Sequence, residues 1–105
     1  MSMSDKEISE ILDTIGIPYA YHHFEDSVSP PFLIYVDEPP THIMADGVIY
    51  MSIRNITLEL YSDTKDSALI KQVEDMFIHN EIRHQKEEDW IESEGMFEFA
   101  FMVQI

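Results

Sequence analysis

Histidine side chains are the first residues of this chain that could bind a metal ion. The chain has five, and two pairs lie close together in the sequence: His22 with His23, and His79 with His84. His22 and His23 fall in a predicted strand, where adjacent side chains point to opposite faces, so one ion does not easily take both. His79 and His84 are separated by a predicted helix end, which differs from the i, i+4 spacing of a helical zinc site. The sequence therefore predicts no metal site.

Clustered carboxylates are the second possibility for chemistry. Five of them lie in one short segment, namely Glu87, Glu88, Asp89, Glu92 and Glu94. A pair of these could serve acid-base catalysis or hold a divalent metal in a hydrolase, and that reading stays as an alternative. Because the chain has 21 acidic residues among 105, such clusters also arise from composition alone, and a solvated face explains this one.

Other catalytic signatures are missing from the sequence. There is no Gly-x-Ser-x-Gly turn, and three glycines are too few for a phosphate-binding loop. Without cysteine the chain has no thiol nucleophile, thiolate ligand or disulfide. We therefore predict a protein that is not an enzyme and that uses no cofactor.

The charge balance restricts the possible partners. With 6 basic residues against 21 acidic ones, the formal net charge is -15, which disfavours nucleic-acid binding through phosphate neutralisation. Three interpretations remain open: solubility, mimicry of a DNA backbone that occupies a DNA-binding protein, and acidic walls around a passage through which DNA slides. No segment is long and apolar enough for a membrane span, and the first residues lack a secretory pattern, so we expect a cytosolic protein.

Two amphipathic segments predict helices. Residues Ser4 to Ile15 repeat apolar side chains at helical spacing, and Ser4 with Glu7 matches a capping box. Several potential N-caps in residues 62–66 open a second helix that runs to about Asn80. Its apolar stripe consists of Leu69, Val73, Met76 and Phe77.

The remaining apolar runs predict strands. They cover residues 19–24, 32–36, 48–53 and 56–61, then a hairpin from 81–94 to 96–105. The last strand has the clearest pattern, because Phe97, Phe99, Phe101, Val103 and Ile105 alternate with mostly polar or small residues. Residues 37–47 contain Pro39-Pro40 and Asp46-Gly47 and predict a loop that ends in a tight turn.

The resulting order is α-β-β-β-β-α-β-β. This order predicts one α+β domain over residues 1–105, with a mostly antiparallel sheet of five to six strands and two helices packed on one face. If one sheet face stays open, we expect exposed aromatic and methionine side chains there to contact other subunits, together with the proline loop. The candidate interface residues are Pro39, Pro40, Met51, Tyr61, Trp90 and Met102.

Three segments resemble a known group of proteins. They are Ala45-Asp-Gly-Val-Ile-Tyr50, the run from Ile56 to Asp66 (ITLELYSDTKD), and Trp90-Ile-Glu-Ser-Glu-Gly-Met-Phe97. These segments resemble small head-tail structural proteins of Gram-positive siphophages and prophages: tail-terminator, tail-completion and minor head-tail proteins. The likeness covers about two-thirds of the chain, from Tyr19 onward.

This resemblance implies a virion structural protein. It implies a sheet-and-helix subunit that forms a ring, commonly a hexamer, at the end of the tail or at the neck. The expected partners are the major tail protein and head-completion or connector proteins. The expected location is the virion, with the host cytoplasm during assembly. No active-site residues come with the family, and the alternative function is that of a small acidic DNA mimic.

Overall fold

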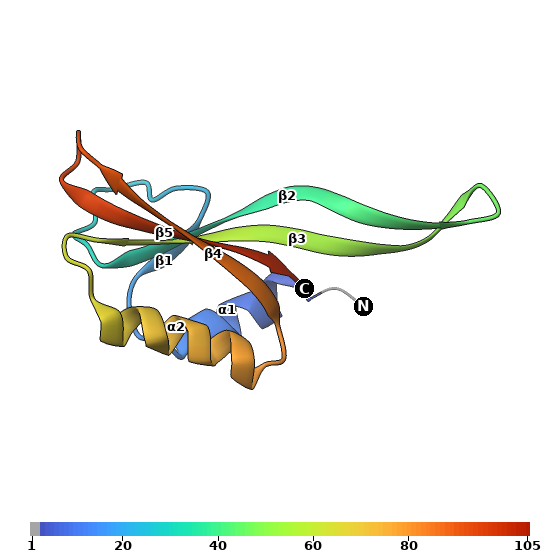
Figure 1. Ribbon diagram of the computed structural model, residues 1–105, viewed down its shortest axis with the longest axis horizontal. Helices are drawn as coiled ribbons and strands as arrows, with labels where there is room; N and C mark the ends of the chain where they lie inside the picture. Colours follow the sequence, from blue (N-terminus) through green and yellow to red (C-terminus); the bar gives the residue numbers. More distant parts are fainter. Residues whose placement is uncertain (1–2) are drawn as a thin grey trace.

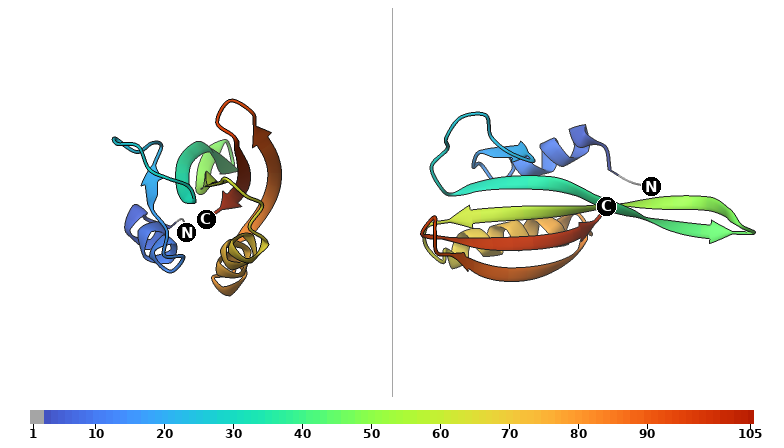
Figure 2. Two further views of the ribbon diagram at one scale, coloured as in Figure 1. Left: turned by 90° about the vertical axis from the view of Figure 1, so that its left-hand side faces the viewer. Right: turned by 90° about the horizontal axis from the view of Figure 1, so that it is seen from above.

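The computed structural model describes residues 3–105. Its elements are α1 (Asp5–Asp13), β1 (Tyr19–Tyr21), β2 (Phe32–Ala45), β3 (Val48–Ser62), α2 (Ser67–His79), β4 (Arg83–Ile91) and β5 (Met96–Gln104). Within these residues the strands form one sheet in the order β1-β2-β3-β5-β4, in which β1 and β2 are parallel and the other pairs antiparallel. Both helices lie below the same face of the sheet (Figures 1 and 2). The predicted α+β class and the mostly antiparallel sheet are confirmed.

The first helix begins at its predicted cap. The Ser4 hydroxyl accepts a hydrogen bond from the Glu7 backbone N–H at 3.2 Å, and the Glu7 carboxylate accepts one from the Ser4 N–H at 3.2 Å. This reciprocal pair is a capping box. Helix α2 begins after Asp66, whose carboxylate accepts the N–H of Leu69 at 3.1 Å.

One hydrophobic core lies between the helices and the sheet. The closing strand supplies the side chains that its alternation predicts, since Phe99 and Phe101 are fully buried and Val103 is nearly so. Aromatic contact joins this strand to the second helix, because the ring centroids of Phe77 and Phe101 are 5.4 Å apart. Other buried members are Ile8, Leu12, Ile15, Leu33, Tyr35, Ile56, Leu58, Leu60, Ile70, Val73 and Met76.

The predicted loop over residues 37–47 is wrong. Strand β2 continues to Ala45 and β3 begins at Val48, so a long hairpin leaves the body of the molecule (Figure 1). We call residues 39–53 the arm. Its tip is a two-residue turn with positive φ at both Asp46 (52°) and Gly47 (77°), as a type I′ turn requires. The two strands predicted at 48–53 and 56–61 are therefore one strand, and the order is α-β-β-β-α-β-β.

Contacts across the hairpin explain why Pro39-Pro40 does not end β2 and why Asn55 does not end β3. Beside the arm β2 is an edge strand, since β1 pairs only with its first part, so Pro39 and Pro40 sit at an irregularity where no neighbouring strand needs their N–H groups. The predicted strands at 48–53 and 56–61 left the polar Asn55 in a break between them. Instead its amide donates to the Pro39 carbonyl and to the Thr41 hydroxyl, both at 2.9 Å.

The first and fourth strands also differ in detail from the prediction. β1 ends at Tyr21, where a strand to Phe24 was predicted. The predicted hairpin between the last two strands is confirmed, with β4 pairing β5 from Arg83 to Ile91. Neither described helix has the length and apolar character needed to cross a membrane.

Candidate interaction surface

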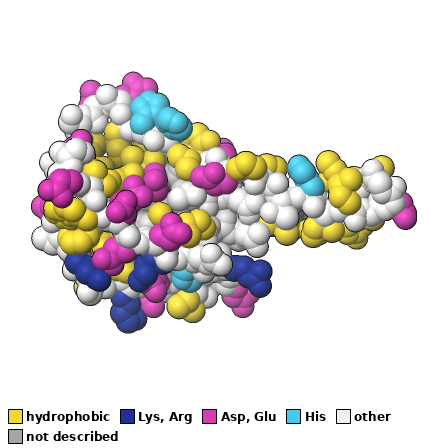
Figure 3. Space-filling view, turned by 45° about the horizontal axis from the view of Figure 1, so that its top comes forward, with side chains coloured by type: hydrophobic (Ala, Val, Ile, Leu, Met, Phe, Trp, Pro, Cys, Tyr) yellow, Lys and Arg dark blue, Asp and Glu magenta, His cyan; other side chains and the backbone are white. Residues whose placement is uncertain are grey.

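The arm holds most of the exposed large hydrophobic side chains of the described residues. Six of the nine lie there: Ile43, Met44, Val48, Ile49, Tyr50 and Met51. Tyr50 is the most exposed, at 74%. Over residues 39–53 the sequence has a single carboxylate, Asp46, and no lysine or arginine. Figure 3 shows hydrophobic side chains along the arm and acidic ones over the body. The arm is therefore a nearly neutral, apolar extension of an acidic body.

Side-chain hydrogen bonds join the two strands of the arm. The His42 ring nitrogen Nδ1 lies 2.7 Å from the Ser52 hydroxyl, and Asn55 binds across to residues 39 and 41 as described above. A two-stranded hairpin alone is marginally stable in water, so such cross-strand contacts help the arm keep one shape.

An arginine ties the base of the arm to the body. Arg54 Nε donates to Asp37 Oδ1 at 2.8 Å, and its Nη2 lies 2.8 Å from Asp5 Oδ1 at the start of α1. Its Nη1 also donates to the Met3 carbonyl at 3.1 Å. The hydrogen bond from Arg54 lowers the pKa of Asp37, although burial opposes this. The guanidinium therefore holds strand β2, strand β3 and the first helix together.

A second surface is the sheet face that the helices leave uncovered, which we call the open face. Strand register places its side chains in four rows across β2, β3, β5 and β4. The rows are Phe32-Tyr61-Glu98-Asp89, Ile34-Glu59-Ala100-Glu87, Val36-Thr57-Met102-Gln85 and Glu38-Asn55-Gln104-Arg83. Five of these sixteen side chains are carboxylates and one is basic, so the open face is both apolar and acidic.

Burial and neighbouring carboxylates shift the pKa values of Glu59 and Tyr61 on the open face. Partial burial raises the pKa of Glu59, and the nearby Glu98 carboxylate raises it further, while a hydrogen bond from Tyr61 opposes the shift. Burial also raises the pKa of Tyr61, as do hydrogen bonds to Glu98 and Glu59. Tyr61 is therefore a neutral hydroxyl donor that lies between two carboxylates.

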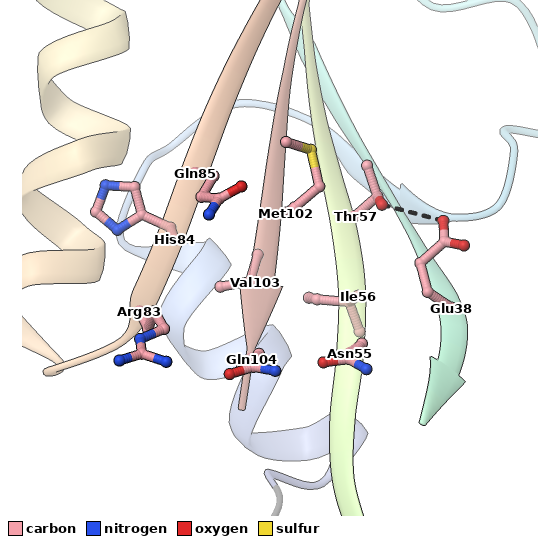
Figure 4. Close-up of a pocket in the computed structure, with 10 residues that line it drawn as sticks. All are labelled: Glu38, Asn55, Ile56, Thr57, Arg83, His84, Gln85, Met102, Val103 and Gln104. Carbon is pink, nitrogen blue, oxygen red and sulfur yellow. Dashed lines mark hydrogen bonds between the residues drawn. The ribbon is translucent and has the colours of Figure 1, made fainter. Parts of the chain in front are cut away.

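A shallow groove of about 370 Å³ lies on the open face near the base of the arm (Figure 4). Its one carboxylate, Glu38, accepts a hydrogen bond from the Thr57 hydroxyl at 3.0 Å, and its one guanidinium, Arg83, comes from the far strand. The lining residues are Glu38, Asn55, Ile56, Thr57, Arg83, His84, Gln85, Met102, Val103 and Gln104. The groove therefore combines amide and apolar side chains with one hydroxyl–carboxylate pair and one guanidinium.

The predicted interface residues fall on different surfaces. Pro39, Pro40 and Met51 lie on the arm, and Tyr61 and Met102 lie on the open face. Trp90 does not lie on the open face, because it pairs in register with Phe97 on the helix side, with ring centroids 4.8 Å apart. It is still 45% exposed at the edge of the sheet. The structure therefore places the proline pair and Met51 on the same hairpin, the pair at its base and Met51 nearer its tip, and leaves Trp90 apart from them.

His22 and His23 lie outside the strand that was predicted to contain them. β1 ends before His22, which has a positive φ of 69°, so strand alternation does not separate His22 from His23. Their Nδ1 atoms are 3.1 Å apart. Even so, residues 3–105 contain no group of three or more side chains that could hold a metal ion. His84 packs against Phe77, with centroids 4.8 Å apart.

Alternation along β4 disperses the clustered acids. Glu87 and Asp89 point to the open face, whereas Glu88 points to the helix side and binds Lys65 at 3.0 Å. Glu92 and Glu94 lie beyond the strand, in the turn before β5. The structure therefore divides the five carboxylates of this segment among the open face, the helix side and the turn.

Neither a scan against models of protein families nor a search among curated proteins finds a match for this chain. The apolar tip of the arm is the feature that sequence reasoning missed. A usable signal was present, because Asp46-Gly47 stands between the uncharged runs Ile43-Met-Ala45 and Val48-Ile-Tyr-Met51. An Asp-Gly pair flanked by apolar runs is a strong hairpin signal.

Proposed function

We propose that this protein is a non-enzymatic structural subunit of the phage or prophage head-tail junction. It forms a ring, commonly of six copies, that caps the tail tube and docks it to the head. The observation that supports this best is the exposed apolar arm. Contiguous apolar surface of this kind is uncommon on proteins that work alone, and it marks sites of contact with other proteins.

The charge distribution agrees with assembly through the arm. Two bodies of strong negative charge repel each other, whereas a nearly neutral arm reaches a neighbour without that cost. The proposed partners are other copies of the chain, the major tail protein and head-completion or connector proteins. The proposed location is the virion, reached from the host cytoplasm. Acidic side chains would suit a passage that DNA crosses without binding.

Electron microscopy of the purified chain tests this function. The protein is imaged alone and after mixing with the major tail protein from the same genome. We expect closed rings, and tail tubes whose ends carry them. Tyr50→Lys on the arm should abolish the rings, whereas Ile78→Lys on α2, another highly exposed apolar site, should leave them intact. A chain that stays monomeric under both conditions would contradict the proposal.

The carboxylates of the open face favour a second candidate function, a DNA mimic that inhibits a host DNA-binding protein. Five carboxylates share that one face, as described above. This function predicts salt-sensitive binding to a basic host protein, with binding lost on the double reversal Glu87→Lys with Asp89→Lys. Reversal of Glu92 and Glu94, in the turn outside the face, is the matched control. Unchanged binding after reversal on the face would exclude this candidate.

A further inference from the structure

Four carboxylates gather at the end of the open face that lies away from the arm. They belong to two rows of side chains, which we call the acidic end: Phe32-Tyr61-Glu98-Asp89 and Ile34-Glu59-Ala100-Glu87. Both rows run unbroken across β2, β3, β5 and β4, so this surface is formed inside the sheet. The two described chain ends instead meet near the base of the arm, where the Met3 N–H donates to the Ile105 carbonyl at 3.1 Å (Figure 1).

The basic side chains of the protein lie away from the acidic end. Within residues 3–105, five of the six lysine and arginine side chains pair with carboxylates that lie off the open face; these five are Lys6, Arg54, Lys65, Lys71 and Lys86. The sixth, Arg83, lies on the open face but in the row nearest the arm. Figure 3 shows the lysine and arginine side chains along the lower edge of the body, with acidic and hydrophobic ones above them. The described part of the chain therefore leaves the four carboxylates without an ion pair.

Aromatic rings border these carboxylates. The ring centroid of Phe32 lies 5.1 Å from that of Tyr61 and 5.4 Å from that of Phe24. Tyr61 pairs in register with Glu98, and Glu59 lies two residues away on β3, so the Tyr61 hydroxyl reaches both carboxylates. A guanidinium is planar, donates to carboxylates through several N–H groups and stacks on aromatic rings. This combination of rings and carboxylates therefore suits arginine better than lysine.

We propose that the acidic end of the open face docks a positively charged segment of another protein, with one arginine side chain held between Glu59 and Glu98 beside Tyr61. Charge selects this occupant. A second copy with its net charge of -15, a nucleic acid and an anionic membrane are all repelled by these carboxylates. Burial and the nearby Glu98 carboxylate raise the pKa of Glu59, and a cation between the two would relieve their repulsion.

This docking surface goes beyond the proposed ring and does not depend on it. It also differs from the DNA mimic in what it recognises. A surface that acts by negative charge alone attracts lysine and arginine alike. A site that combines Tyr61 with two carboxylates prefers arginine, because only the guanidinium matches both the carboxylate geometry and the ring.

Binding of hexa-arginine and hexa-lysine peptides, measured by fluorescence anisotropy at physiological salt, tests the surface. We expect the arginine peptide to bind at least about tenfold more tightly than the lysine peptide. The double variant Glu59→Gln with Glu98→Gln should weaken the arginine peptide by at least about tenfold. Its matched control, Glu10→Gln with Asp75→Asn, removes two negative charges from the helices and should change the dissociation constant less than about twofold. Circular dichroism checks that both variants are folded.

A third variant isolates the aromatic ring. Tyr61→Leu keeps both carboxylates and removes the ring, so the preference for arginine over lysine should fall to less than about threefold. A preference that this variant leaves unchanged would contradict a role for the ring.

Equal weakening by the two double variants would mean attraction to net charge alone and would overturn the proposal, as would the absence of binding. Amide chemical shifts locate the contact separately. Hexa-arginine should shift the amides of residues 59–61 and 98–100 and leave those of α1 unchanged. If the same shifts appeared when the protein alone was concentrated, a second copy would be the occupant and the proposal would be wrong.

The outcomes for the docking surface and the proposed function are distinguishable. Rings on tail tubes from a protein that shows no preference for arginine would remove the docking surface and leave the proposed function. A clear preference for arginine in a protein that never forms rings with the tail protein would do the reverse.

Discussion

The Nε atom of Arg54 lies 2.8 Å from Oδ1 of Asp37 at the point where the arm leaves the sheet. The same guanidinium reaches Asp5 at the start of α1, so one side chain connects the arm to the body. Arg54 is 20% exposed and Asp37 44% exposed, which places this pair between a surface and a buried ion pair.

Replacing this arginine should loosen the base of the arm. We expect Arg54→Met to lower the free energy of unfolding by about 1–2 kcal/mol, since the lost contacts are charged hydrogen bonds that remain partly solvated. Urea denaturation measures the change. Lys71→Met removes the more exposed pair with Asp75 on α2 and should leave the denaturation midpoint unchanged.

The Arg54 effect should also depend on pH. The pKa of Asp37 is lowered in the folded state, so its pairing stabilises the protein above the ordinary value of 3.8 and is lost as pH falls through the folded pKa. The difference between Arg54→Met and the parent should therefore shrink on acidification. A difference that stays constant down to pH 3 would show that the Asp37 carboxylate is not its source.

Glu59, which lies near Glu98 on the open face, should change the stability with pH in the direction opposite to Asp37. Burial and Glu98 raise the pKa of Glu59, so its ionised form destabilises the fold. This cost is absent below the ordinary pKa of 4.5 and complete above the folded pKa. We expect Glu59→Gln to raise the stability at pH 7 by less than about 1 kcal/mol, because the site is partly solvated, with no gain at pH 4. Thermal unfolding at both pH values tests this, with Glu94→Gln in the turn as control.

The turn at the arm tip requires glycine at its second position. Gly47 has a φ of 77°, and a Cβ built on it meets nothing within 4 Å, so the cost of a side chain is conformational. We expect Gly47→Val to weaken the arm by about 1–2 kcal/mol. Amide hydrogen exchange along residues 41–53 should become faster, while exchange in β5 should not change. Asp46→Asn is the control, because asparagine suits the same turn.

The capping box should stabilise the first helix. Ser4→Ala removes the hydroxyl that accepts the Glu7 N–H, and N-cap losses of this kind cost about 1 kcal/mol. We expect faster amide exchange in α1 and a lower free energy of unfolding. Ser4→Asp keeps an acceptor at the cap and should behave like the parent. If serine, alanine and aspartate gave equal exchange, the cap would have no energetic role.

The local chemistry of the sequence was enough to predict several elements. Ser4 and Glu7 predicted the start of α1 because a capping box needs only residues within one turn. The alternation of Phe99, Phe101 and Val103 predicted both the closing strand and its buried face, because a strand on a core has a period of two. The α+β class followed from these patterns and is confirmed.

Contacts between residues distant in sequence decided the rest. The pair Pro39-Pro40 predicts a loop when only its neighbours are considered, but it lies in a strand because β1 stops short and leaves β2 at an edge. Asn55 predicts a break, but its amide finds the Pro39 carbonyl across the hairpin. Trp90 was expected on the open face, and its pairing in register with Phe97 places it on the other.

By itself, the sequence determined the fold class, the helix caps, the buried face of the last strand and the strongly acidic charge, since propensity, period and composition are local or additive. The tertiary structure alone decided that residues 39–53 form an apolar arm that leaves the body. Whether a strand is central or at an edge depends on which strands lie beside it, and β1 pairs with only the first part of β2 once the sheet has assembled.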